Sequence, residues 1–366
     1  MKHSLKWNRN KTTRNNFLTY GVVILVYIII QIMIGADSIS STMEGLLVPI
    51  CAYVVMALSL NLTVGVLGEL SLGHAGFMSV GAFTGVTAAV ALGRNVSSGP
   101  VLLIVGMVVG ALFAALVGFL IGIPVLRLKG DYLAIVTLAF GEIIKGIFNN
   151  LYVGVDSSGL HVSLLSDTTN LAEDGDLVIG GPMGLSGIPR ESTFTAGVIL
   201  IILSLIVIFH LVNSRSGRAI MAVRDNRIAA ESIGINITKY KLMAFTVSAA
   251  LAGAAGTLFA MNYTTLVANK FDFNTSILIL VFVVLGGLGN MLGSIIAATA
   301  LTILPEALRE FSDYRMLVYA IVLILVMLAT NNDTFKAVLA ASSSGARRKR
   351  SRLTWDRNWL PSRPRA

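Results

Sequence analysis

Long apolar segments recur along this chain and are joined by short polar links. The clearest example, residues 101–125, contains no charged side chain. A helix of about 20 apolar residues spans the hydrocarbon core of a bilayer. Charged residues make up only 13% of the chain, whereas soluble domains carry about a quarter. These features predict an all-α, polytopic membrane protein and exclude an ordinary soluble domain.

The apolar segments predict about ten transmembrane helices. They lie at about 17–35, 45–66, 70–92, 101–125, 131–153, 193–212, 242–266, 275–290, 293–309 and 314–330. A basic N-terminus, 1–16, precedes this transmembrane domain, 17–330, and a basic tail, 331–366, follows it. We expect the tail to be disordered and attracted to anionic lipid headgroups, with a partner protein as the alternative.

Basic residues indicate which links face the cytoplasm. The first 16 residues hold basic but no acidic side chains, and the loop 213–241 is also net basic. The loop 154–192 is acidic, which predicts that it faces outward. With ten spans both termini lie in the cytoplasm, and eight or twelve spans would give the same orientation. Because the basic residues gather in the tails and one loop, the net charge of +9 does not indicate nucleic-acid binding.

Residues 65–83 combine several glycines with Glu69, Ser71 and His74. Ionisable side chains at membrane depth are costly unless they face a cavity, a partner or the interface. Glycine-rich backbone predicts a broken or re-entrant helix, which commonly lies beside the substrate route of a transporter. We therefore consider these three side chains as pathway or gate residues. The alternative places Glu69 in a short cytoplasmic turn and His74 in a structural hydrogen bond.

A short sequence echo suggests an internal duplication. Val66–Leu70 reads VLGEL and Val284–Leu288 reads VLGGL, and each precedes an apolar segment that contains glycine. Internal repeats are common in transporters. Two matches of five residues make the duplication a hypothesis only.

The predicted fifth span carries two charged residues, Glu142 and Lys145. Side chains three residues apart share one face of a helix, so these two can form an ion pair. Pairing would lower the cost of holding both charges in the membrane. A structural pair is the favoured interpretation, and a place for Glu142 on the translocation pathway is the alternative.

Motifs for catalysis are missing from the sequence. It contains no G-x-x-x-x-G-K-[ST] loop to cradle phosphates and no H-E-x-x-H zinc motif. We therefore expect neither an enzyme nor a metal site, and no cofactor in this chain. If the protein moves a solute uphill, the energy has to come from another subunit.

The loop 213–241 is longer than a simple turn between spans requires. Its pattern predicts an amphipathic helix over about Arg218–Ile233, capped by Ser214 or Ser216 and ended by Gly234. The small side chains of its apolar strip offer little area for insertion into lipid. They suit close docking into a groove on a partner protein better.

Within this loop the run Ala229–Gly234, AAESIG, resembles the EAA-type coupling motif of ABC importer permeases. The surrounding block, together with residues 61–82, 126–145 and 180–189, is similar to the permeases for branched-chain amino acids of the LivM type. The resemblance covers about residues 45–330 and leaves out the basic ends. The motif reads AAE here rather than EAA, which affects the exact register of any contacts carried over from the family.

The resemblance implies a permease subunit that works with other proteins. Its partners would be a second, homologous permease, two cytoplasmic ATPases that bind ATP and Mg²⁺, and an extracytoplasmic binding protein for amino acids. The ATPase-coupling residues would be Arg218, Arg224, Arg227, Ala230, Glu231 and Gly234. The external face would include Gly180, Gly181, Pro182 and Gly184, where a binding protein could dock. The segment from Glu69 to His74 would lie close to the translocation route.

The expected function is therefore ATP-driven import of leucine, isoleucine and valine across a bacterial or archaeal cell membrane. The same architecture could instead serve urea, short amides or other hydrophobic amino acids. A stand-alone channel or secondary transporter is an alternative from another class, and it predicts solute flux without ATPase subunits.

Overall fold

The computed structural model describes most of the chain. It covers residues 2–36, 40–94, 96, 98–128, 130–156, 159–164 and 175–308, with isolated positions at 317, 320, 321 and 324. The predicted tail 331–366 and nearly all of the predicted last span lie outside these residues. The chain divides into two units, Met1–Ile303 and Leu304–Ala366, and all contacts reported below belong to the first.

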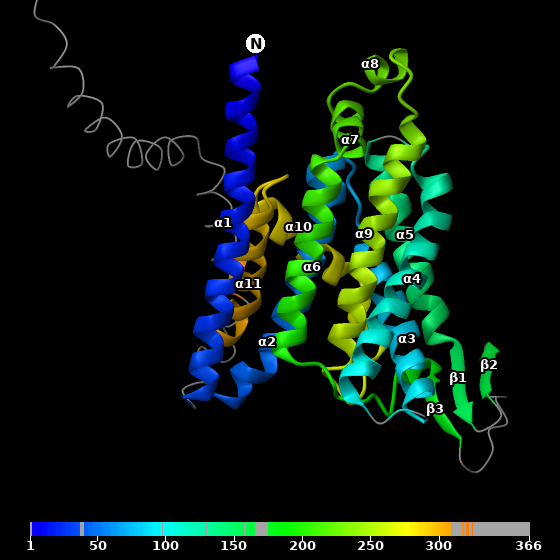
Figure 1. The fold of residues 1–366 in the computed structure, drawn as a ribbon. Coiled ribbons are helices and arrows are strands. Elements are labelled where there is room, and N and C mark those ends of the chain that lie inside the picture. Colours follow the sequence, from blue (N-terminus) through cyan, green and yellow to red (C-terminus); the bar gives the residue numbers. More distant parts are fainter. Residues whose placement is uncertain are drawn as a thin grey trace, which may run out of the picture. The chain divides into compact units, whose positions relative to one another are not determined.

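Most of the described residues are helical (Figure 1). The α-helices are α1 (Lys2–Gly35), α2 (Ser41–Asn61), α3 (His74–Gly93), α4 (Gly99–Val125), α5 (Asp131–Asn149), α6 (Phe194–Asn213), α7 (Arg215–Asp225), α8 (Arg227–Ser232), α9 (Ile237–Ala260), α10 (Phe273–Gly286) and α11 (Met291–Ala307). Shorter helical segments are η1 (Leu62–Leu67, a π-helical turn), η2 (Gly181–Met183) and η3 (Ala268–Phe271).

Six helices in the described residues are long and apolar enough to cross a membrane. They are the apolar part of α1, α2 with η1, α3, α4, α6 and α9. The two apolar helices α10 and α11 are shorter, at 14 and 17 residues. The predicted count of ten spans is therefore not confirmed.

The interior of the helical unit is formed by α2, α3 and α9, which are the most buried of the long helices. Small residues allow their backbones to approach closely, as is usual for packed membrane helices. A Cβ atom at Gly81 of α3 would collide with the backbone of Gly253 in α9. The Thr257 hydroxyl of α9 donates to the Gly81 carbonyl at 2.8 Å. This packing fixes the positions of α3 and α9, which carry several residues of the candidate site.

The predicted break near residues 65–83 is confirmed. Helix α2 continues through the π-turn η1, the backbone then runs without regular structure over Gly68–Gly73, and α3 begins at His74. Gly68 has φ of +80°, a left-handed conformation that favours glycine at a helix end. We call residues 68–73 the helix break.

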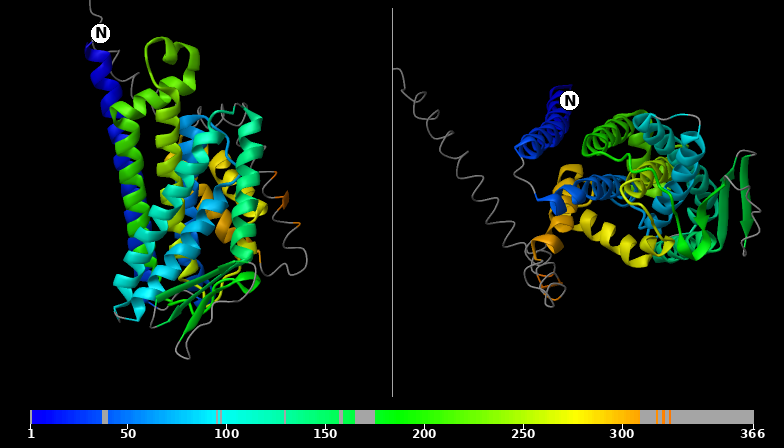
Figure 2. Two further views of the ribbon diagram at one scale, coloured as in Figure 1. Left: turned by 90° about the vertical axis from the view of Figure 1, so that its right-hand side faces the viewer. Right: turned by 90° about the horizontal axis from the view of Figure 1, so that it is seen from below.

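The fold is not all-α, which corrects the sequence-based expectation. The predicted fifth span 131–153 ends at Asn149, and β1 (Leu151–Asp156), β2 (Gly159–Leu164) and β3 (Asp176–Gly180) follow in the acidic loop. They form an antiparallel sheet in the order β2-β1-β3. The apolar residues of β1 extend the apolar run of α5, so hydropathy alone did not separate the strand from the helix. The sheet lies at the end of the unit opposite α7 and α8 (Figures 1 and 2).

The turn between α10 and α11 packs against η1. The Asn61 side chain of α2 accepts from the Gly289 backbone N–H at 2.8 Å and donates to the Ser294 hydroxyl at 2.8 Å. The two echoed segments, VLGEL and VLGGL, thus both occupy the C-terminal end of a helix, and those two ends lie side by side. The internal duplication itself stays a prediction.

Candidate functional site

The loop 213–241 contains two short helices instead of the single helix predicted over Arg218–Ile233. Asn226 interrupts it with an extended backbone, φ −154° and ψ 106°. Its side chain accepts from the Ala229 N–H at 3.0 Å and so caps α8. Asparagine is one of the residues most favoured at the N-cap of a helix. Ser214 caps α7, as predicted, and Gly234 follows α8 with φ of +83°.

One face of this loop is turned into the protein. Ile220, Val223 and Ala230 are almost fully buried, so Ala230 belongs to the core of the loop itself. The opposite face is exposed and carries Ile228 and Ile233, whose exposed fractions are 81% and 74%. Two isoleucines so exposed at a helix of six residues suit contact with another protein better than contact with water.

The remaining residues of the predicted coupling motif differ in position. Arg218, Glu231 and Gly234 are exposed, and Arg227 is half-buried. Ala230 is buried whereas Ile233 is exposed, so these two residues do not share one apolar face. The interruption at Asn226 rotates α8 relative to α7, and a pattern based on one continuous helix could not show this.

Arg224 contacts the membrane-spanning part of the chain directly. Its guanidinium Nη1 donates to the Gly65 carbonyl of η1 at 3.0 Å. Its Cγ lies 2.6 Å from the position that a Cβ would take on Gly68. A glycine at position 68 leaves room for the Arg224 stem. Helix α7 therefore packs directly against the start of the helix break.

The helix break is also held by an ion pair between Glu69 and Lys241 of α9. Lys241 is 5% exposed, and a buried lysine needs a partner of opposite charge. The sequence analysis did not identify Lys241, because 172 residues separate it from its partner. Its place at the start of an apolar span was the only available signal.

The start of α3 lies deeper in the helical unit. Ser248 lies seven residues beyond Lys241, about 10 Å further along α9. Its hydroxyl donates to the Ser59 carbonyl, and the Ser59 hydroxyl hydrogen-bonds His74 Nε2 at 2.7 Å. His74 therefore makes the buried structural hydrogen bond considered above. The Ser71 hydroxyl and His74 Nδ1 are buried and have no hydrogen-bond partner among the described residues.

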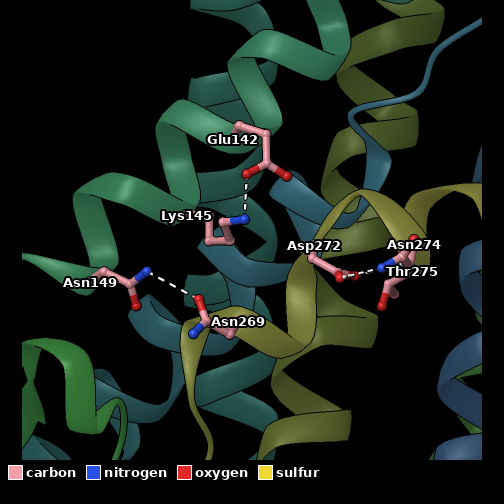
Figure 3. Close-up of polar contacts among 7 residues, drawn as sticks. All are labelled: Glu142, Lys145, Asn149, Asn269, Asp272, Asn274 and Thr275. Atoms are coloured by element: carbon pink, nitrogen blue, oxygen red, sulfur yellow. Dashed lines mark hydrogen bonds and ion pairs between the residues drawn. The ribbon is translucent and has the colours of Figure 1, made fainter.

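Glu142 and Lys145 form the expected ion pair on α5 (Figure 3). Asp272, the N-cap of α10, lies near this pair. Burial acts to raise the pKa of Asp272, but hydrogen bonds from Thr275 and Asn274 and the charge of Lys145 outweigh it and hold the pKa below its usual value. One turn of α5 further on, Asn149 donates to Asn269 at 3.2 Å.

The four residues predicted on the external face lie between the sheet and the segment after α9. Gly180 ends β3, and Gly181 begins η2 with φ of +55°, where a Cβ would approach the Tyr152 ring to 2.8 Å. A Cβ on Gly184 would collide with the Leu266 carbonyl. Pro182 lies within η2. These residues thus join the sheet closely to the rest of the unit.

Metal ligands do not gather in the part of the chain that the structure describes: it contains no group of three or more His, Cys, Asp or Glu side chains that could hold an ion. The candidate site instead comprises the loop 213–241 with its two exposed isoleucines, the helix break and a charged group on α5 and α10.

Comparison with known proteins shows which protein family the chain resembles. Residues 42–327 match the family described as branched-chain amino acid transport system / permease component. The chain is 37% identical over 286 residues to the high-affinity branched-chain amino acid transport system permease protein LivM of Escherichia coli K12, a match that covers 75% of this chain and 66% of that protein.

More distant relatives differ in what their names say they transport. The permease protein LivH of the E. coli K12 branched-chain amino acid system is 25% identical, over 75% of this chain and 88% of its own length. The ribose import permease protein RbsC of Haemophilus influenzae is 26% identical, over 69% of this chain and 76% of its own length. No solved structure matches the chain.

Proposed function

The chain belongs to the family of branched-chain amino acid transport permeases, and from this premise we propose that it is the membrane-spanning subunit of an ATP-driven importer for leucine, isoleucine and valine. The geometry of the loop carries this proposal. Ile228 of α8 and Ile233, which follows it, are exposed, while Arg224 of α7 donates to the Gly65 carbonyl of η1 and its stem lies against Gly68 of the helix break. A loop built in this way can bind a partner and pass its movement to a membrane helix.

The family and this arrangement together support a set of proposed partners. We propose that two cytoplasmic ATPases, which carry ATP and Mg²⁺, bind the exposed face with Ile228, Glu231 and Ile233. A second, homologous permease would complete the translocation route, as the similarity to both LivM and LivH suggests. A binding protein outside the membrane would dock at the sheet end, near Gly181 and Gly184. Both termini would then face the cytoplasm.

The coupling step uses residues of this chain only. When the ATPases close, α7 and α8 move with them. Arg224 pulls on the Gly65 carbonyl and on the backbone at Gly68, and the Glu69–Lys241 pair joins the same point to α9. Movement of the helix break would shift the start of α3 and so the packing of α3 against α5. In this proposal Arg224 is a positioning residue that connects the loop helix α7 to the helix break. The resemblance had instead implied that Arg224 contacts the ATPase directly.

The function is tested by uptake into proteoliposomes that contain the complete complex and its loaded binding protein. We expect ATP-dependent uptake of leucine. Uptake of urea or short amides without leucine would contradict the substrate, and uptake by the permease pair without ATPases or ATP would establish a channel or secondary transporter instead.

Docking of the ATPases has a separate test. Ile228→Glu on the exposed face should reduce co-purification of the ATPases strongly, because a buried charge would replace an apolar contact. The matched control Thr238→Glu, at an exposed position at the start of α9, should leave co-purification intact. Equal recovery of the ATPases with both variants would place their binding elsewhere.

A further inference from the structure

Helix α3 is capped at its start by neighbouring helices. The first N–H groups of a helix have no partner within the helix, and a Ser, Thr, Asp or Asn side chain at the N-cap usually accepts one of them. The N-cap of α3 is Gly73, which has no side chain for this purpose. The Ala75 N–H instead donates to the Ser276 hydroxyl of α10 at 3.2 Å. Just before α3, the Leu72 N–H donates to the Thr137 hydroxyl of α5 at 3.0 Å. The start of α3 therefore depends on its contacts with α5 and α10.

Ser71 is of a residue type that favours the N-cap, yet it caps no helix in this conformation. It lies two residues before Gly73 and is 1% exposed. Within the part of the chain that the structure describes, its hydroxyl has no hydrogen-bond partner. A buried hydroxyl without a partner carries a cost in free energy, and such exceptions in a folded protein call for an explanation. A role in a second conformation would provide one.

A small change of backbone would make Ser71 the N-cap of α3. A helix that began two residues earlier would have Ser71 at its N-cap, followed by residues 72–74. An N-cap side chain accepts from the second or third N–H after it, here that of Gly73 or His74. Gly73 has φ of −98° and ψ of 19°, so a rotation of about 60° in ψ brings it to the helical region.

The proposed coupling path ends at the same stretch of backbone. The Glu69–Lys241 ion pair holds the helix break two residues before Ser71. Gly73 packs against α5, since a Cβ on it would collide with the Thr137 carbonyl. A shift of the break away from α5 and α10 would therefore separate the two backbone N–H groups from their hydroxyl acceptors. In that state the start of α3 needs a cap from its own sequence.

We propose that Ser71 is a positioning residue of the transport cycle, which becomes the N-cap of α3 when the helix break moves away from α5 and α10. The proposal rests on the import function proposed above and adds a second conformation to it. In the present conformation the Thr137 and Ser276 hydroxyls accept from the backbone around the start of α3. In the second conformation α3 begins at Leu72 and Ser71 caps it. The start of α3 is thus capped in both conformations.

Ser71→Ala distinguishes this role from an ordinary structural one. Because the hydroxyl has no partner in the present conformation, its removal should not lower the unfolding temperature of the purified permease. It should still lower the maximal rate of leucine uptake by the complete complex in proteoliposomes. We expect a decrease of about fivefold, the change in population that the loss of one N-cap produces. A lower unfolding temperature, or normal uptake, would overturn the proposal.

Ser204→Ala is the matched control. Ser204 lies in α6, and its hydroxyl is also buried without a partner among the described residues. Its removal should leave the unfolding temperature no lower, as for Ser71→Ala, and should leave leucine uptake unchanged. An equal loss of uptake in both variants would contradict a specific role for Ser71.

Two larger substitutions test the hydroxyl itself. Threonine and valine have nearly the same shape, but only threonine can accept a hydrogen bond at an N-cap. Ser71→Thr should therefore import leucine faster than Ser71→Val. Equal rates for the two variants would show that the hydroxyl of residue 71 is not used, which would contradict the proposal.

A double variant tests the competition between the two sets of caps. Ser276→Ala removes a cap that α3 uses in the present conformation. Added to Ser71→Ala, it should restore part of the lost uptake, because each conformation then lacks one cap and the balance between them returns. Residues that act independently would give additive losses. A double variant slower than Ser71→Ala would therefore count against the proposal.

The outcomes separate this proposal from the proposed function. If the unmodified complex fails to import leucine, the proposed function is wrong. If it imports leucine, but Ser71→Ala and Ser71→Val also import it normally, the second conformation is wrong and the proposed function stands. Co-purification of the ATPases with each variant shows that the complex is intact.

Discussion

Two ion pairs join a glutamate to a lysine in the helical unit, and they differ in burial. The Glu69 and Lys241 side chains are 16% and 6% exposed, whereas those of Glu142 and Lys145 are 42% and 22% exposed. The first pair connects distant segments and lies beside the Arg224 contact. The second joins two residues that are three positions apart on one helix. The comparison teaches that the same pair of residue types connects remote segments in one place and only stabilises a single helix in another.

The largest effect is expected from breaking the buried pair. Lys241→Met would leave Glu69 without its partner in a protected position, at a cost of about 3–5 kcal/mol. Thermal unfolding of the purified permease should show a large destabilisation, and the double variant with Glu69→Gln should recover part of it. Lys145→Met should destabilise the protein less than Lys241→Met, because its partner Glu142 is more exposed than Glu69. Equal destabilisation by Lys241→Met and Lys145→Met would show that the two ion pairs do not differ in their contribution to stability.

Gly68→Ala tests the close approach of α7 to the helix break. The left-handed backbone at Gly68 and the nearby Arg224 stem both disfavour a Cβ atom at this position. We therefore expect the free energy of unfolding to fall by about 1–2 kcal/mol from the backbone conformation alone. Gly146→Ala on α5 is the control, since no atom lies within 4 Å of its added Cβ; it should be neutral or stabilise by up to about 1 kcal/mol. Unfolding temperatures of the two variants measure the difference. A neutral Gly68→Ala would mean that α7 does not rest on the break.

Asp272 gives the smallest expected effect, and its sign follows from its pKa. The folded state holds this pKa below the usual 3.8, so the ionised form stabilises the fold above that value. This contribution should be lost as the pH falls through the lower folded pKa. Asp272→Asn retains an N-cap but should remove that part of the acid dependence, as measured by unfolding temperature between neutral and acidic pH. An unchanged acid dependence would show that Asp272 contributes little.

The sequence predicts local features of this fold better than distant contacts. Glycines among ionisable residues located the helix break, and a spacing of three residues gave the Glu142–Lys145 pair. Hydropathy does not distinguish β1 from the end of α5, because Leu151–Asp156 continues the same apolar run. Asn226 divides the loop helix by capping α8, and a periodic pattern passes over such a local preference.

Contacts between remote segments left no signal in a single sequence. Lys241 meets Glu69, and Arg224 meets Gly65, only after α7 and α9 have folded against η1. Glu142 and Asp272 likewise come close to each other only through the packing of α5 and α10. Arg224 was therefore assigned to the partner-facing side of the loop, where the resemblance placed it.

The central claim is that Arg224 transmits movement of the ATPases to the helix break. The most direct measurement is the amount of leucine imported per ATP hydrolysed by the complete complex in proteoliposomes, compared between the unmodified protein and Arg224→Ala. We predict that Arg224→Ala still co-purifies with the ATPases and hydrolyses ATP, while leucine uptake per ATP falls by about tenfold, within the usual range of coupling free energies. An unchanged ratio of uptake to hydrolysis in Arg224→Ala would contradict the account.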